Sequence, residues 1–186
     1  ICEFVNVMRD VPDAPSPAQS YAADTGGDFA EANVYAGNHR TGSAFSQNII
    51  KGNASLVVEG GTFKNLNGGS TDGFLGSYRL AGKIEGNTSI VIRANDNIVI
   101  NGDINASSGF VDGNAEVTFV GDASKLTFAG NVKAASASGN NGALGGRASI
   151  KIGTAEEAFT GGFNAKINDG FASLEVSNAD TEVNFA

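Results

Sequence analysis

Short runs in which apolar and polar residues alternate recur along this chain, each beginning just after a glycine. One run reads Gly86-Asn87-Thr88-Ser89-Ile90-Val91-Ile92, and similar runs follow Gly52, Gly113, Gly146 and Gly170. Alternation with a period of two is typical of β-strands, because successive side chains point to opposite faces. The leading glycines are 34, 27, 33 and 24 residues apart. A turn and a short strand repeated at such intervals predict a stacked repeat architecture.

Further apolar positions follow the leading glycines at two similar offsets in most repeats. The second apolar pair lies 12 to 15 residues after the glycine, at Ile98 and Ile100 in one repeat and at Leu126 and Phe128 in the next. The third apolar position lies 18 to 21 residues after it, for example at Ile104. Three short strands per repeat predict an all-β fold, a single-stranded parallel β-helix (three-sided β-solenoid) of about five to six coils. A β-sandwich of irregular strands is the alternative.

In such a stack, equivalent strand residues of successive coils lie above one another, about 4.8 Å apart. The alternation then predicts a column of inward-facing core residues: Leu56, Val58, Ile90, Ile92, Val117, Phe119, Ile150, Ile152, Leu174 and Val176. The residues between them are predicted to face outward: Val57, Val91, Thr118, Lys151 and Glu175. Every strand of this kind would bury one face and expose the other.

The turns before these strands repeat as well. We expect the leading glycines to adopt positive φ, which glycine does without steric cost. Asn53, Asn87 and Asn114 follow three of those glycines and predict an amide ladder along the axis, which Arg147 and Phe171 interrupt. The two longer steps predict loop insertions at residues 68–73 and 136–142, because a stacked core cannot absorb extra residues.

The start of the chain differs from the rest. Residues 2–8 alternate as a strand would, and the chain's three prolines follow at Pro12, Pro15 and Pro17. Proline-rich segments are extended. We therefore divide the chain into an N-terminal strand and linker, residues 1–28, and a β-solenoid domain, residues 29–186.

Composition and charge restrict the classes of partner that we expect this protein to bind. Glycine accounts for 26 of 186 residues, which fits a chain with many turns and few helices. The net charge of −8 disfavours nucleic acids and anionic membrane surfaces, because both are negatively charged. No apolar run is long enough to span a bilayer, so no membrane insertion is expected.

The sequence offers no catalytic constellation. The lone histidine, His39, lies in a polar stretch, and the lone cysteine, Cys2, cannot form an internal disulfide. A hydrolase of the β-helix type needs two acids at a fixed separation, but Asp and Glu here lie mostly beside Gly or Asn, as in ordinary turns. We therefore predict no catalytic residue, no enzyme activity and no cofactor. Calcium is the one ion that the turns suit, at residues 95–97 or at Asp112 with Asn114.

The stretch Gly52-Asn53-Ala54-Ser55-Leu56-Val57-Val58-Glu59-Gly60-Gly61-Thr62-Phe63 resembles the repeats of bacterial surface β-solenoids, the passenger regions of autotransporter-like adhesins. The resemblance extends over roughly residues 30–186. It implies an extracellular or cell-surface location and a non-catalytic scaffold for adhesion or assembly.

These sequence features are compatible with three functions. The first is an extracellular structural protein that self-assembles end to end, as a homopolymer, into a surface fibre or matrix. In that arrangement the N-terminal segment pairs with a neighbour's open end by strand addition. The residues assigned to this interface are Phe4, Val5, Val7, Val183 and Phe185. The alternative is an adhesin-type binding module that recognises a glycan or host protein through its inserted loops, and a minor alternative is a polysaccharide-degrading β-helix enzyme.

Overall fold

The computed structural model describes residues 19–23, 28–37, 49–70, 74–75, 78–79, 82–135, 143–168, 170–180 and 183–185. Over these residues the chain is all-β, and its strands pair in parallel sheets, apart from one two-stranded antiparallel pair. The one helical element among them is the 3-10 turn η1, Ala123–Lys125, so no described helix is long and apolar enough to cross a membrane. The predicted interface residues Phe4, Val5 and Val7 lie outside the described ranges.

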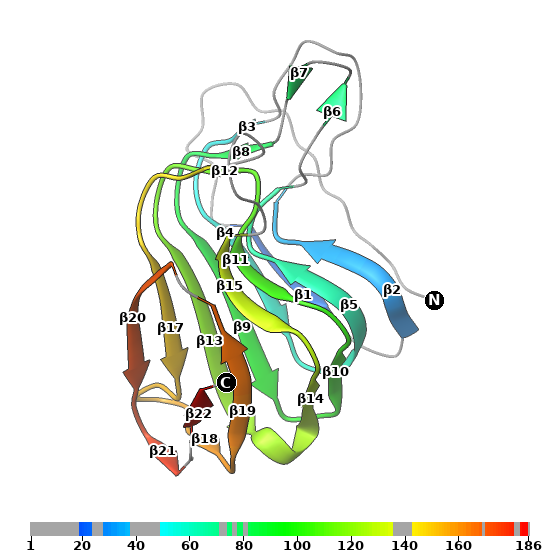
Figure 1. Ribbon diagram of the computed structural model, residues 1–186, viewed down its shortest axis with the longest axis vertical. Helices are drawn as coiled ribbons and strands as arrows, with labels where there is room; N and C mark the ends of the chain where they lie inside the picture. The colour runs from blue at the N-terminus through cyan, green and yellow to red at the C-terminus, as the bar shows by residue number, and fades with distance from the viewer. Residues whose placement is uncertain are drawn as a thin grey trace.

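The main face of the molecule is a sheet of parallel strands in the order β1-β4-β9-β13-β17-β20, here called sheet A (Figure 1). The short strands β18 and β21 extend it beside β13. Its strands are β1 (Gln19–Ala23), β4 (Ala54–Val58), β9 (Thr88–Ala94), β13 (Ala115–Asp122), β17 (Ala148–Ile152), β18 (Phe159–Thr160), β20 (Phe171–Val176) and β21 (Ala179–Asp180).

A second parallel sheet, sheet B, runs in the order β14-β10-β5-β11-β15-β19-β22, with β2 also paired to β5. Its long strand β5 pairs with both β10 and β11, so two short strands of the next coil continue one strand of the coil before. The strands are β2 (Asp28–Tyr35), β5 (Gly61–Asn67), β10 (Ile98–Ile100), β11 (Ile104–Ser107), β14 (Leu126–Phe128), β15 (Asn131–Ala135), β19 (Phe163–Ile167) and β22 (Val183–Phe185).

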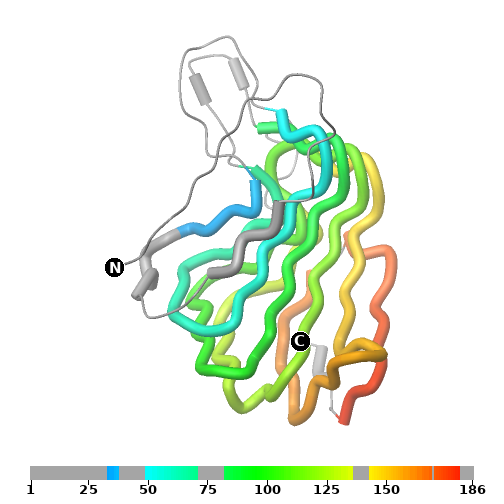
Figure 2. The backbone as a smooth tube through the Cα atoms, turned by 180° about the vertical axis from the view of Figure 1, so that it is seen from behind, coloured from blue at the N-terminus to red at the C-terminus, as the bar shows by residue number. Residues whose placement is uncertain are grey.

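The third parallel sheet, sheet C, is short, in the order β16-β12-β8-β3. Its strands are β3 (Ile49–Ile50), β8 (Lys83–Ile84), β12 (Phe110–Val111) and β16 (Ala143–Leu144). As far as β16 the chain passes through sheets A, B and C in turn and then begins again one strand further along; after β16 it alternates between sheets A and B (Figure 2). This path is compatible with a β-solenoid.

The core is a set of residue columns that run perpendicular to the strands. Leu56 lies opposite Ile90, Ile90 opposite Val117, and Val117 opposite Ile150. The same register places Val58, Ile92, Phe119 and Ile152 in a second column. All eight side chains are buried, so the neighbouring coils cover each other's apolar groups.

The columns do not stay buried at the β20 edge, contrary to the sequence prediction. Leu174 lies opposite Ile150 and Val176 opposite Ile152, yet they are 38% and 49% exposed. The reason is that β20 pairs with β17 on one side, while no described strand of sheet A covers its other side. Thr118 differs from the prediction in the opposite direction, because it is more buried than expected. It lies in the outward row, but it is only 6% exposed, since Val91 and Lys151 flank it on the adjacent strands.

The expected positive φ is wrong for three of the leading glycines. Gly170 has φ of 97°, whereas Gly86, Gly113 and Gly146 do not have positive φ. These three are needed for a different reason, close approach between coils. A Cβ on any of them would lie 2.5 to 2.6 Å from the carbonyl oxygen of the leading glycine in the preceding coil. That same oxygen accepts a backbone hydrogen bond of 3.0 Å from each glycine's N–H.

The predicted insertion at residues 68–73 begins later than expected. Gly68, Gly69 and Ser70 are buried and belong to the stack: the N–H of Gly68 donates to Asn105 (2.9 Å) and that of Ser70 to Ser108 (3.1 Å). The described part of the insertion is the antiparallel hairpin of β6 (Phe74–Leu75) and β7 (Tyr78–Arg79), seen at the top of Figure 1. The other predicted insertion, residues 136–142, lies outside the described residues.

Candidate functional site: the outer face and free edge of sheet A

The turn that leads into sheet A carries a ladder of asparagines. The Oδ1 atom of Asn53 accepts a hydrogen bond of 2.8 Å from the backbone N–H of Asn87, and Asn87 does the same for Asn114. Asn114 accepts in turn from the N–H of Arg147 at 2.9 Å. The ladder therefore runs from side chain to backbone, not between amide side chains as the sequence predicted. Arg147 closes the ladder because its side chain carries no acceptor.

A second polar ladder runs along sheet B. Asn65 Oδ1 accepts from the N–H of Asp103 (2.6 Å), and Asp103 Oδ1 accepts from the N–H of Asn131 (2.9 Å). The other carboxylate oxygen of Asp103 lies 2.5 Å from Lys133 Nζ. Partial burial alone would raise the pKa of Asp103, but the hydrogen bonds from Lys133 and Asn131 outweigh it and hold that pKa below its ordinary value. This ladder is structural, since it joins coils and leaves no carboxylate oxygen without a partner.

The outer face of sheet A is a regular array of small polar and charged side chains. Ser89 Oγ donates to Ser55 Oγ at 2.8 Å, across adjacent strands. In the same row, the next strand carries Glu116, whose carboxylate lies 2.9 Å from Lys151 Nζ and accepts from Ser149 Oγ at 3.5 Å. The hydrogen bond and charge of Glu116 raise the pKa of Lys151, so Lys151 stays protonated at neutral pH.

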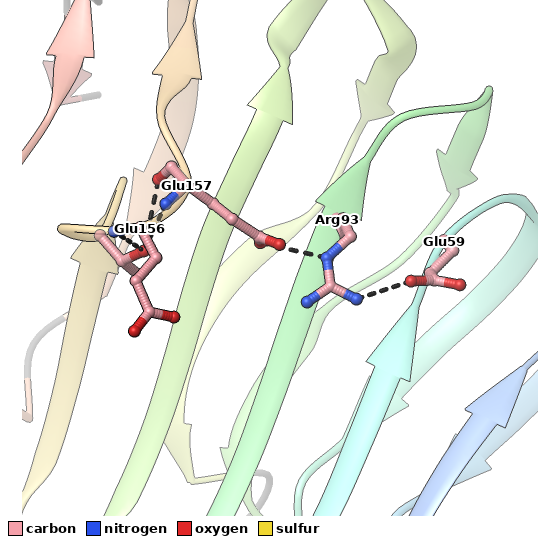
Figure 3. A network of polar contacts seen from close by, with 5 residues as sticks. Glu59, Arg93, Glu156 and Glu157 are labelled. Atoms are coloured by element: carbon pink, nitrogen blue, oxygen red, sulfur yellow. Dashed lines mark hydrogen bonds and ion pairs between the residues drawn. The ribbon is translucent and has the colours of Figure 1, made fainter.

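A second charged network crosses the same face further along the strands (Figure 3). Arg93 lies between two carboxylates, with Nη1 at 2.6 Å from Glu59 and Nε at 3.1 Å from Glu157. Hydrogen bonds to Glu59 and then to Glu157 raise the pKa of Arg93. The network joins β9 to the turns after β4 and β17, which are far apart in the sequence. The network links these coils, and its three charged groups are engaged in ion pairs with one another.

A shallow polar depression of about 440 Å³ opens on this face at the start of the strands. Its lining comes from four successive strands and the turns before them: Asn87, Thr88, Ser89, Asn114, Glu116, Arg147, Ser149, Ala172 and Ser173. Sequence reasoning did not single it out as a site. A signal was present, because Glu116 replaces the serine that the other repeats carry at its position, and Arg147 replaces the asparagine that three other repeats carry at its position.

The free edge of β20 is the second candidate region. Of the large hydrophobic side chains that are exposed in the described residues, two, Leu174 and Val176, lie on this strand, and the third is Ile49 on β3. The predicted interface residues Val183 and Phe185 belong to β22, which pairs with β19. That pairing joins the two strands within sheet B, so the exposed apolar edge of sheet A lies at Leu174 and Val176.

Aspartates beside turn glycines and asparagines each bind a local partner where the structure describes their side chains. Asp112 lies 2.8 Å from Lys83 Nζ, and Asp122 caps η1 by accepting from the N–H of Ser124. Asp96 is exposed in the turn before β10, where it accepts from the N–H of Asn97. His39, Cys2, Asp72 and Asp169 lie outside the described residues.

The two turns considered for calcium do not gain further acidic ligands. Among the residues that the structure describes, no three His, Cys, Asp or Glu side chains gather as a metal site requires. The carboxylate of Asp112 faces Lys83, and the Oδ1 atom of Asn114 is taken by the N–H of Arg147. The chain therefore shows no preformed cage at these turns.

Comparison with known proteins adds no family to this description. A scan of family models, a search of curated proteins and a search of solved structures each gave no match.

Proposed function

We propose that this chain is a non-catalytic structural protein whose coils form a three-sided, single-stranded parallel β-helix that stacks end to end with copies of itself. The resemblance to bacterial surface solenoids supports an extracellular or cell-surface setting, in a fibre or matrix. The observation that carries the proposal is the free edge of β20. There Leu174 and Val176 continue, in register, the two columns that are buried elsewhere in sheet A.

The physical reason is that an exposed parallel strand offers both unpaired backbone groups and an apolar surface. A strand added beside β20 would satisfy that backbone and cover Leu174 and Val176, as β17 does on the other side. The opposite edge of the same sheet is β1, which also pairs with one described strand only, β4.

The proposed contact joins the β1 edge of one copy to the β20 edge of the next. The two edges of a parallel stack differ, so this contact is head to tail and does not close into a symmetric dimer. Such heterologous contacts propagate into filaments. The N-terminal segment with Phe4, Val5 and Val7 precedes β1 in the sequence and remains part of this proposed interface.

The test is the concentration dependence of assembly, measured by sedimentation velocity and negative-stain microscopy. We expect the unmodified chain to form filaments or short linear oligomers as its concentration rises. Val176→Asp places a charge in the interface and is expected to leave monomers, because an unpaired buried charge is costly. Thr127→Asp, at an exposed position on β14, adds the same charge elsewhere and is the matched control.

Two results would contradict the proposal. One is a chain that stays monomeric at every concentration tested, and the other is assembly that Val176→Asp leaves unchanged. The adhesin-type module that binds a glycan or host protein through inserted loops stays a prediction, since residues 71–73 and 136–142 of those loops are not described. The polysaccharide-degrading enzyme also stays a prediction.

A further inference from the structure

The polar depression on sheet A has the size and chemistry of a small ligand site. Its volume of about 440 Å³ lies within the range that ligand pockets occupy, roughly 300–1,000 Å³. Its lining, however, is almost entirely Asn, Ser, Thr, Glu and Arg. These side chains disfavour a wholly apolar molecule, because their polar groups would lose water without gaining hydrogen bonds. A ligand with many hydroxyl groups is the natural match.

An irregularity in the sheet shapes one side of the depression. Phe171 lies opposite Ala148 and Ser173 opposite Ser149, so Ala172 is an extra residue between them. This is a bulge, a feature that re-aims side chains and is over-represented beside functional sites. Ala172 and Ser173 both line the depression, and their small side chains leave that side of it open.

The rim of the depression carries a row of hydrogen-bond donors. The Oδ1 atoms of Asn87 and Asn114 are occupied by backbone N–H groups of the next coil. This fixes each amide and leaves its Nδ2 group without a partner among the described residues. Arg147 follows in the row; it is exposed, and its guanidinium group forms no hydrogen bond or ion pair with a described residue. Successive coils space these three donors about 4.8 Å apart.

The floor of the depression carries acceptors. Ser89 and Ser149 contribute hydroxyl groups, each of which retains a lone pair for a further donor. Glu116 is held in place by Lys151 at 2.9 Å, and that ion pair neutralises its charge. Arg147 is therefore the one charge of the lining without a counter-charge among the described residues, and it sits beside a polar floor.

We propose that this depression binds a carbohydrate that carries a carboxylate, a glycan containing a uronic acid. The carboxylate pairs with the guanidinium of Arg147, whose planar fork matches both carboxylate oxygens. Sugar hydroxyls accept from the Nδ2 groups of Asn87 and Asn114 and donate to Ser89 and Ser149. This site lies within one chain and does not depend on end-to-end stacking.

The test compares two disaccharides that differ in one carboxylate, cellobiouronic acid and cellobiose, by isothermal titration calorimetry with the full chain. We expect the acid to bind and the neutral sugar to bind about tenfold more weakly or worse, as a charge-assisted hydrogen bond requires. Arg147→Gln should reduce binding of the acid by a similar factor. Lys125→Gln removes the same charge from an exposed position on η1 and should leave binding unchanged.

Several outcomes would overturn the proposal: no binding of the acid at millimolar concentration, equal binding of both sugars, or equal effects of the two charge-removing variants. Ser149→Leu gives a second readout, because it fills the floor without changing charge, and it should abolish binding while far-ultraviolet circular dichroism stays unchanged. Val176→Asp should bind the acid as the unmodified chain does. Loss of binding in that variant would show that one chain does not suffice.

Discussion

Ile90 and Leu174 occupy equivalent positions in one column of sheet A, yet Ile90 is fully buried and Leu174 is 38% exposed. Their strands have the same alternation of residues, and both side chains are aliphatic. The difference lies in their neighbours: β9 has a strand on each side, β4 and β13, whereas β17 is the one described strand of sheet A that pairs with β20. In a stack of coils, therefore, the same alternation of residues gives buried side chains where another coil covers the strand and exposed side chains where none does.

Sheet C sharpens the contrast between the middle and the β20 end. The coils that begin with β4, β9 and β13 each add a strand to it, β8, β12 and β16. No described strand of the coils that begin with β17 and β20 joins this sheet. At the β20 end, therefore, no described strand covers the outer edge of sheet A, and none extends sheet C. For this reason the stacking contact is proposed at that end.

Truncating the same column at its two ends should give very different costs. Ile90→Ala leaves a cavity inside fully packed coils and should lower the free energy of unfolding by about 2–5 kcal/mol. Leu174→Ala removes a partly solvated side chain and should cost about 1 kcal/mol or less in the monomer. Urea denaturation followed by circular dichroism measures both. Equal losses would mean that the β20 edge is covered in solution.

The close approach of the leading glycines should make them intolerant of a single methyl group. Gly113→Ala forces a Cβ against the carbonyl oxygen of Gly86, so the coils must separate, at a cost of about 1–3 kcal/mol. Gly162→Ala is the control, because no atom lies within 4 Å of its Cβ position. Thermal melting of both variants provides the measurement. A neutral Gly113→Ala would contradict the observed spacing of the turns.

Acid should weaken the ladder on sheet B. Because the folded pKa of Asp103 is below its ordinary value, its contribution to stability is present above the unfolded pKa of about 3.9 and is lost as pH falls through the folded value. Asp103→Asn removes this titration, so its stability should depend less on pH below about pH 4. Urea midpoints measured across that range for both proteins give the comparison. Parallel pH profiles would show that Asp103 does not contribute.

The smallest effect is expected at the exposed network on sheet A. Arg93→Gln breaks two ion pairs, to Glu59 and Glu157, but all three side chains are partly solvated. The loss of stability should be about 1 kcal/mol or less, and added salt should reduce it further. Melting temperatures at low and high salt check this. A large, salt-independent loss would show that the network does more than join coils.

Much of the fold could be predicted from the sequence. The alternation after each leading glycine predicted parallel strands in repeated coils, and the structure is all-β with parallel sheets. The offsets predicted strands at Ile98, Ile104 and their equivalents, where β10 and β11 lie. The inference worked because strand periodicity and turn residues are local properties that each repeat displays anew.

The candidate sites could be predicted less well from the sequence. The sequence assigned the assembly interface to Phe4, Val5, Val7, Val183 and Phe185, and that assignment stays a prediction. The structure adds an exposed apolar edge at Leu174 and Val176 on β20, which the sequence placed in the core. The depression was missed because its lining comes from four strands. The bulge at Ala172 cannot be inferred from one repeat alone, and neither can the absence of a described partner for the guanidinium of Arg147.

The sequence by itself determined the strand periodicity, the inward and outward rows and the positions of the turns, because these depend on residues that are close along the chain. Only the tertiary structure decided which rows are covered, which asparagine accepts from which coil, and where a hollow opens. Those features depend on contacts between residues some 24 to 38 positions apart, such as Asn65 with Asp103, and on the number of coils beside each strand. Burial in a stack is a property of neighbouring coils, and one coil's sequence does not contain it.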